Sequence, residues 1–523
     1  MSSPRHSDPL RNALLSFAAL LVVSLAVYGS VWAIDFWAAP DHPGPIDFAR
    51  DQSIDDVLSG VSEVTVAVLG IAITVVAIIV ELAANRYTPR ISEMFIRDPV
   101  NVGVMGFFTI TTILTFWGTL SLHGPSHPTA LVLAMMFFIS VSLLAILPYF
   151  AYVFDFLTPT QVINRIKRNA VKALTRLQAG GGDLDLMQSR VLEGTEQLGE
   201  LALNGIDNHD KAISISALEA LEAVAAASIK DKKSMPDTWH DTSGVVKGDH
   251  DFVAFHESIL YTLQARQTWV EMKILRQYQA VFGAALNKMP DVAHMVSIHT
   301  RHIAATAHRD NDREVLALAV RFMNTYLRAA INRKDVRTAY NLYNEYRGLL
   351  EDVMTEHDRE LVIELAEYFK FYGQLSFQRD LAFILETAAY DMCTLLEKAL
   401  ERKMSFHDEI LDIFLQLDRE PDQATATQQE ASLRGVRKAQ VKLATYYLVH
   451  NEEARARRIF EDMRTESPDR LASIREELSL ITEPEYWEVS DRGINFDWLP
   501  PEQRAQLDVF FDWFKAAETA VVP

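Results

Sequence analysis

The longest charge-free stretch of the sequence limits what this chain can fold into. No Asp, Glu, Lys or Arg occurs in the 56 residues from Pro99 to Phe154. A helix needs about 20 apolar residues to cross a bilayer, so this stretch is long enough for two crossings. Residues 123–128 (HGPSHP) interrupt it with a glycine and two prolines, which favour a turn. We therefore predict two membrane spans, at about 101–122 and 129–153.

Two earlier apolar segments predict two more spans. Residues 13–34 carry no charge, and residues 64–84 carry only Glu81. The first segment, which Arg5 and Arg11 precede, also fits a secretory signal, but the apolar core of a signal is usually about 7–15 residues long. We interpret it as a retained anchor. The sequence thus predicts a four-span transmembrane helical bundle in a domain of residues 1–157.

The charges between these spans predict their orientation. Residues 35–63 contain seven acidic residues and one arginine, whereas residues 85–98 contain three arginines. Basic residues next to a span stay on the cytoplasmic side, so both termini are expected in the cytoplasm of a bacterial-type inner membrane. The single cysteine, Cys393, excludes a disulfide framework and suits a reducing compartment. The net charge of −20 argues against nucleic acid as a partner.

The rest of the chain is predicted to be all-α. Apolar residues recur at helical spacing, and alternating β-branched runs are missing. We expect a cytoplasmic α-solenoid-like domain at 158–417, then a tetratricopeptide-like hairpin and an aromatic C-terminal cap at 418–523. The hairpin matches tetratricopeptide spacing at Ala444, Tyr447, Ala456, Phe460 and Pro468, with a weaker copy around Ala330, Ala339, Tyr343 and Tyr346. Two copies are fewer than the three that a free-standing solenoid needs, so a non-repetitive bundle remains the alternative.

Polar residues in the predicted spans form the first candidate site. Glu81 lies near a cytoplasmic span end, where it can pair with a nearby arginine or belong to an ion site. Three threonines of the third span recur every four residues and could line a pore or allow close helix packing. The candidate membrane polar site comprises Glu81, Asn85, Arg86, Arg90, Thr111, Thr115 and Thr119.

Large aromatic residues near the C-terminus form a candidate docking surface. Aromatic rings contribute strongly to both cores and interfaces, so this region can cap the preceding helices or bind a partner. The candidate docking residues are Tyr447, Phe460, Trp487, Trp498 and Trp513.

Histidines and acidic residues gather in two places. The polar stretch 231–251 and its neighbours contain both types, but no ligand spacing defines a metal geometry. His299 and His302 share a helix face at i, i+3, and we interpret this face as a polar surface. Phosphate-binding loops, dinucleotide motifs and nucleophile elbows are also missing. We therefore predict no metal, no cofactor and no enzymatic activity.

Two motifs carry a resemblance to a known family. Residues 72–90 (AITVVAIIVELAANRYTPR) and 95–101 (FIRDPVN) resemble the predicted bacterial membrane proteins of domain-of-unknown-function family twenty-two fifty-four. Residues 201–208 are similar to a further element of that family. Glu81 departs from the glutamine common there, and Asn208-His209 stands in place of Asp-Pro. The resemblance covers roughly residues 60–225 and implies an integral membrane protein, with no established chemistry.

Two functional hypotheses follow from these features. The first is a membrane-tethered docking scaffold that self-associates as a homo-oligomer in the lipid bilayer and binds a cytoplasmic protein partner. The alternative is an oligomeric ion channel or transport pore that the cytoplasmic domain gates.

Overall fold

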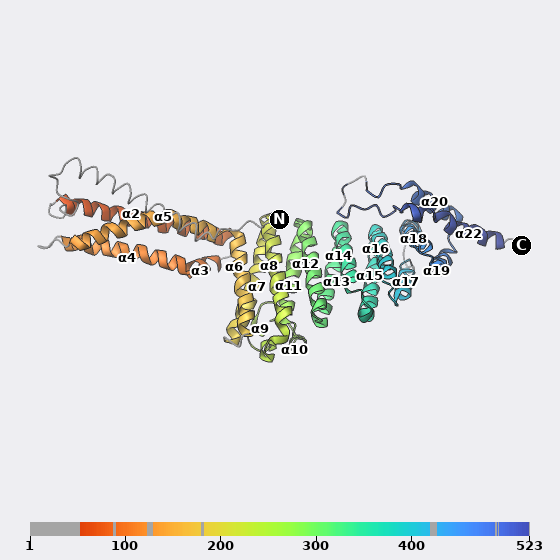
Figure 1. Cartoon of the computed structure of the whole chain (residues 1–523), viewed down its shortest axis with the longest axis horizontal. Helices are drawn as coiled ribbons and strands as arrows, with labels where there is room; N and C mark the ends of the chain where they lie inside the picture. The colour runs from red at the N-terminus through yellow and green to blue at the C-terminus, as the bar shows by residue number, and fades with distance from the viewer. Residues whose placement is uncertain are drawn as a thin grey trace. The chain divides into compact units, whose positions relative to one another are not determined.

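The computed structural model describes residues 53–86, 90–122, 129–178, 183–418, 426–486, 489 and 491–521. These residues form helices and loops and contain no β-strand, which confirms the predicted all-α class (Figure 1). The chain divides into two compact units, Met1–Ile166 and Lys167–Pro523. The first predicted span, 13–34, lies outside the described residues.

The first unit contains α2 (Ser53–Arg86), α3 (Arg90–Ile96), α4 (Pro99–Leu122) and α5 (Thr129–Phe156). Helices α2, α4 and α5 pack against one another. Each contains a segment long and apolar enough to cross a membrane, at Glu63–Leu82, Pro99–Trp117 and Ala134–Phe156. Large apolar side chains such as Ile71, Phe116 and Leu147 stay exposed on their outer faces. Such a surface is unfavourable in water and suits hydrocarbon.

A fourth segment, Lys211–Ser234, meets the same criteria of length and composition but lies in the second unit. It corresponds mainly to α8 (Lys211–Asp231), which packs against α7 (Leu184–Asp207), α11 (Trp269–Lys288) and α12 (Pro290–Arg309). Its apolar residues Leu218, Leu221 and Val224 are fully buried against these neighbours. Protein therefore covers the apolar face of α8.

The second unit is a stack of helical hairpins in two layers (Figure 1). Along one layer α8, α12, α14, α16 and α18 contact one another in turn, and along the other α7, α11, α13, α15 and α17 do so. This two-layer stack is the arrangement of an α-solenoid. Its further helices are α7 (Leu184–Asp207), α11 (Trp269–Lys288), α12 (Pro290–Arg309), α13 (Arg313–Asn332), α14 (Val336–Val353), α15 (Arg359–Gln378), α16 (Ala382–Glu401), α17 (His407–Phe414), α18 (Ala426–Val449) and α19 (Glu453–Met463).

Shorter elements and the chain ends complete the unit. Helix α6 (Pro159–Gln178) contains the boundary between the two units. The stretch between α8 and α11 forms the short helices η2 (Lys232–Ser234), η3 (Asp237–His240), α9 (Val245–Gly248) and α10 (Glu257–Ala265), and η4 (Glu356–Asp358) precedes α15. The chain closes with α20 (Pro468–Leu480), α21 (Pro501–Arg504) and α22 (Leu507–Val521).

The hairpins share one type of turn. His209, Asn311 and Lys334 each adopt a left-handed backbone with φ of 54–55°. The aspartate that follows each of them donates its N–H to the carbonyl five residues earlier, as in Asp210 N to Gly205 O at 2.7 Å. The same aspartates accept a hydrogen bond from the N–H three residues later and so cap the next helix. This repeated turn, which the tetratricopeptide spacing does not include, reverses the chain at each of these hairpins.

The C-terminal helices cover the last hairpin of the stack. Helices α20 and α22 pack on α18, and α22 also packs on α19. The ring of Phe460 on α19 contacts those of Trp513 and Phe514 on α22, with centroids 5.9 and 4.7 Å apart. A terminal hairpin without such cover would expose its apolar face to water.

Candidate functional site

The predicted polar pairing at the end of α2 falls partly outside the described residues. Glu81 is exposed on α2. The side chains of Asn85, Arg86 and Arg90 lie outside the part of the chain that the structure describes, so their pairing with Glu81 stays a prediction.

The threonine face of α4 lies within the first unit. Thr111 and Thr115 are buried, and Ser142 of α5 donates a hydrogen bond to the Thr111 hydroxyl at 3.3 Å. Each threonine hydroxyl donates to the carbonyl four residues earlier, at 2.9 Å for Thr111, 2.7 Å for Thr115 and 2.8 Å for Thr119. These hydroxyls therefore bond their own helix while the face packs against α5.

A small cavity lies between α2, α4 and α5. Its volume is about 20 Å³, which is room for about one water molecule. Its walls are mostly apolar, with hydroxyl groups from Thr65, Thr112 and Ser142.

Asp98, part of the 95–101 motif, connects the α3–α4 junction with α5 and with Arg165 in the first part of α6. It precedes Pro99, the first residue of α4, and its Oδ1 accepts a hydrogen bond from the Val100 N–H at 3.0 Å. The same oxygen accepts from the Tyr152 hydroxyl of α5, and Oδ2 pairs with Arg165 of α6 at 2.9 Å. The motif therefore ties the α3–α4 junction to α5 and α6.

Asn101 makes a second connection from the same motif. Its Nδ2 donates to the carbonyl of Phe95 on α3 at 3.1 Å, and its Oδ1 accepts from the Tyr149 hydroxyl at 2.6 Å. The side chains of Asp98 and Asn101 therefore both have a structural role in this motif, because they connect the α3–α4 junction to neighbouring helices. The Asp-Pro pair before an apolar helix was the available sequence signal for the cap. Nothing in the local sequence indicated that Tyr152 and Arg165 would be the long-range partners of Asp98.

The aromatic residues proposed as a docking surface lie in different environments. Tyr447 is fully buried, with its hydroxyl 3.1 Å from His407 Nε2, and Phe460 is buried under α22. Trp513 packs on Phe460, and Trp498 donates its indole N–H to the carbonyl of Thr482 at 3.2 Å. Trp487 lies outside the described residues. Tyr447 and Phe460 are core residues here.

Between α20 and α21 the chain returns along the solenoid, and its described residues there, 481–486, 489 and 491–500, form no helix or strand (Figure 1). Residues 491–499, which we call the return segment, contact the face formed by α14, α16 and α18. The sequence predicts aromatic cover in this region, but no sequence pattern indicated this extended segment with its ion pairs.

Ion pairs hold the first part of the return segment. Asp491 pairs with Arg337 of α14 at 2.9 Å, and this hydrogen bond lowers the pKa of the Asp491 carboxyl. Arg492 pairs with Asp391 of α16 at 2.7 Å, and Arg347 of α14 contacts the same carboxylate at 3.2 Å. Burial raises the pKa of Asp391, although both arginines oppose that rise. Because Asp391 is deeply buried, losing either arginine would leave its charge poorly compensated.

Ring stacking and lysines hold the second part. The Phe496 ring stacks on that of Tyr390 in α16, with centroids 4.9 Å apart and planes 8° apart. Asp497 accepts a hydrogen bond from the Tyr390 hydroxyl and pairs with Lys438 of α18 at 2.7 Å. Lys442 of α18 donates to the backbone carbonyl of Phe496 at 3.0 Å. The α14–α16–α18 face therefore offers matched partners for two carboxylates, one guanidinium and one aromatic ring.

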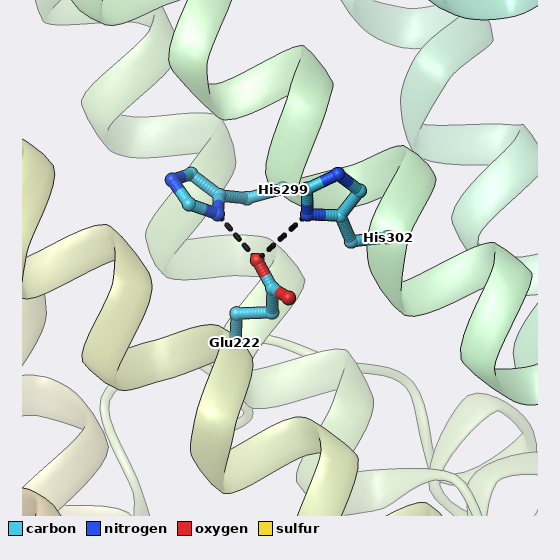
Figure 2. A group of neighbouring side chains, drawn as sticks. All are labelled: Glu222, His299 and His302. Atoms are coloured by element: carbon cyan, nitrogen blue, oxygen red, sulfur yellow. Dashed lines mark hydrogen bonds and ion pairs between the residues drawn. The ribbon is translucent and has the colours of Figure 1, made fainter. Parts of the chain in front are cut away.

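A group of three side chains of the types that can ligate metals lies elsewhere in the solenoid (Figure 2). Glu222 of α8 points between His299 and His302 of α12. Its Oε2 lies 2.5 Å from His299 Nδ1 and 3.2 Å from His302 Nδ1. Hydrogen bonds and charge from the two histidines lower the pKa of the Glu222 carboxyl, while burial opposes this effect. The i, i+3 spacing of the histidines was visible in the sequence, but the partner 77 residues away from His299 was not.

The polar stretch 231–251 contains ion pairs rather than a cluster of metal ligands in the described residues. Lys273 of α11 is buried and pairs with Asp249 and Asp251, each at 2.7 Å. His240 is buried, and His250 lies 3.3 Å from Glu196. These contacts fix the stretch against α7 and α11.

Comparison with known proteins finds a similarity in the N-terminal part of the chain. No curated protein and no solved structure gives a significant match. A family model, described as predicted membrane protein (DUF2254), matches residues 10–220, which include the three described spans and the Asp98 motif. The match confirms the resemblance found in the sequence: residues 10–220 of this chain are similar to the DUF2254 family of predicted membrane proteins.

Proposed function

We propose that this chain is a multi-pass inner-membrane protein whose cytoplasmic solenoid is a docking platform for protein segments. Its family and its apolar spans support the membrane part. The acidic loop before α2 and the arginines after it support an orientation with both termini in the cytoplasm. The role is binding rather than catalysis.

The contact that carries the docking proposal is the return segment on the α14–α16–α18 face. An extended peptide that crosses three neighbouring solenoid helices, with side chains in matched polar and aromatic sites, is a common way for helical repeats to bind partners. Here the chain's own residues occupy these sites. We propose that a partner segment with the same chemistry replaces them: a carboxylate next to a guanidinium, then an aromatic ring next to a carboxylate.

Tethering makes the return segment a strong competitor for any partner. A covalently linked segment acts at an effective concentration that reaches the millimolar range for short flexible links. A partner must therefore bind with higher intrinsic affinity, or act where the segment is already released. The docking platform is thus autoinhibited in the state described here.

The test measures binding of a fluorescent peptide of residues 489–500 to the full-length chain in mild detergent. Replacing both Phe496→Ala and Asp497→Ala in the chain removes the ring stack and the lysine pair, so its own segment binds more weakly. We expect the peptide to bind this released variant about 10-fold more tightly than the wild type, since each 1.4 kcal/mol changes affinity tenfold.

Two control variants test whether tighter peptide binding depends on release of the return segment and on the same ion-pair site. Val489→Ala changes a fully exposed side chain and should leave peptide binding at the wild-type level. Arg337→Ala, added to the released variant, removes the ion-pair partner of Asp491 from an exposed position on α14 and should weaken peptide binding. If the released variant binds no peptide, or binds it equally well without Arg337, the return segment is a permanent structural element and the proposal is wrong.

The contacts of the threonine face favour packing as its role, so we place the function in the solenoid rather than in a pore. Self-association through the spans remains part of the proposal. The particle mass of the full-length chain in the same detergent measures it, and a strictly monomeric particle would contradict it.

A further inference from the structure

We propose that Glu222, His299 and His302 form a binding site for a divalent transition-metal ion, with Zn²⁺ as the ion that best suits the donors. The three donor atoms lie within 4.8 Å of one another. One carboxylate and two imidazoles, with a position left for water, are a common zinc ligand set. This site is independent of the docking face described above.

The side chains already converge on one point. Both imidazoles direct Nδ1 at the same Glu222 oxygen, at 2.5 and 3.2 Å (Figure 2). Around a tetrahedral zinc ion with bonds of about 2.0–2.2 Å, neighbouring donors lie about 3.4 Å apart. The His302 distance is close to this value, and the His299 distance requires the carboxylate to withdraw by about 1 Å. Glu222 is only partly buried, so its side chain has room to do so.

The core holds His299 in place, whereas His302 is open to solvent. His299 is 4% exposed, and its Nε2 is also buried without a hydrogen-bond partner among the described residues. Its position is fixed by the core, where its ring lies 6.4 Å from that of Tyr278. The side chain of His302 is 43% exposed and faces an open side. An ion and its water ligand can therefore reach the site from solvent.

A bound ion would link two hairpins of the solenoid. Glu222 belongs to α8 and the histidines to α12, and these helices are neighbours in one layer of the stack. In a repeat protein, stability depends on the interfaces between neighbouring hairpins. The ion would therefore stabilise the interface between the α7–α8 and α11–α12 hairpins.

The test uses the full-length chain in detergent after removal of metals with a chelator. Titration with Zn²⁺ in a calorimeter should show one tight site per chain, and Co²⁺ should give the visible absorption bands of a tetrahedral site. His302→Ala should lower the affinity at least about 100-fold, because even loss of an outer-shell partner usually costs about 10–100-fold. Glu222→Gln should lower it as well.

His294→Ala is the matched control. His294 lies on the same helix, and its Nε2 is 3.4 Å from a Glu345 oxygen, but the described residues offer no second histidine there. The tight site should persist in this variant. Circular dichroism checks folding, and His302→Gln replaces His302→Ala if the latter unfolds.

Hydrogen exchange provides a second measurement. Zn²⁺ should slow exchange in α8 and α12 of the wild type and leave the His302 variant unchanged. The proposal is overturned if the wild type binds no Zn²⁺ tightly, or if binding survives both His302→Ala and Glu222→Gln. In either case the three side chains form a hydrogen-bonded cluster only.

Discussion

His240 lies between α8 and α10 with both ring nitrogens buried and without a hydrogen-bond partner among the described residues. Burial lowers its pKa to about 4, and the charge of Lys232 adds to this effect. Burial likewise lowers the pKa of His407 to about 4. Because the ordinary value is 6.5, the unfolded chain takes up these protons first as the pH falls. Both histidines therefore contribute stability that is present above pH 6.5 and is lost as the pH falls toward 4.

At the scale of one residue, we predict that His240→Gln weakens this acid sensitivity. The wild type loses about 3 kcal/mol at pH 4 through His240, since each unit of pKa shift corresponds to about 1.4 kcal/mol. The uncharged glutamine has no such loss. Melting temperatures of the full-length chain between pH 7 and pH 4 measure the difference.

The control for this prediction is His209→Asn, at an exposed turn position where φ is 55° and asparagine is well tolerated. This variant should keep the acid sensitivity of the wild type. If His240→Gln and the wild type lose equal stability as the pH is lowered, the prediction is contradicted.

At the scale of helices, Asp98 is the residue through which α3, α4, α5 and α6 are connected. It caps α4 and accepts hydrogen bonds from Tyr152 and Arg165, and its side chain is 11% exposed. A cap is typically worth about 1 kcal/mol, and a hydrogen bond to a charged group about 1.5–3 kcal/mol. Loss of all three contacts at once should therefore lower the stability of the packing among these four helices.

We predict that Asp98→Ala destabilises the first unit by about 2 kcal/mol or more. Asp98→Asn keeps an acceptor for the cap but loses the ion pair with Arg165, so its effect should be smaller. The midpoint of detergent-induced unfolding, followed by circular dichroism, measures both. Asp155→Asn, which removes a different carboxylate, on α5, is the control. Equal midpoints for Asp98→Ala and this control would show that the connection is not important.

At the scale of the whole molecule, the chain combines a membrane unit with a large helical stack. The proposed orientation rests on the distribution of arginine and lysine around the spans. We predict that protease added to spheroplasts leaves the solenoid intact, whereas protease added to inverted membrane vesicles digests it. A C-terminal tag reports the result by immunoblot, and a periplasmic protein controls for leakage. Digestion of the tag in intact spheroplasts would contradict the orientation.

The sequence was sufficient for the class of fold and for the three described spans. The stretch from Pro99 to Phe154 has no charge over 56 residues, and partition into lipid depends on length and apolarity rather than on tertiary neighbours. The Asp98-Pro99 pair similarly marks a helix start through local geometry. The i, i+3 spacing of His299 and His302 places both on one helix face for the same reason.

Only the tertiary structure decided what these local features contact. Segment 211–234 satisfies the same criteria of length and composition as the spans, yet α8 is buried by α7, α11 and α12. Glu222 meets His299 across 77 residues, and Asp497 meets Tyr390 across 107. Local sequence determines which helix forms and which face is apolar. Which faces meet depends on how the hairpins stack, and no short segment of sequence contains that information.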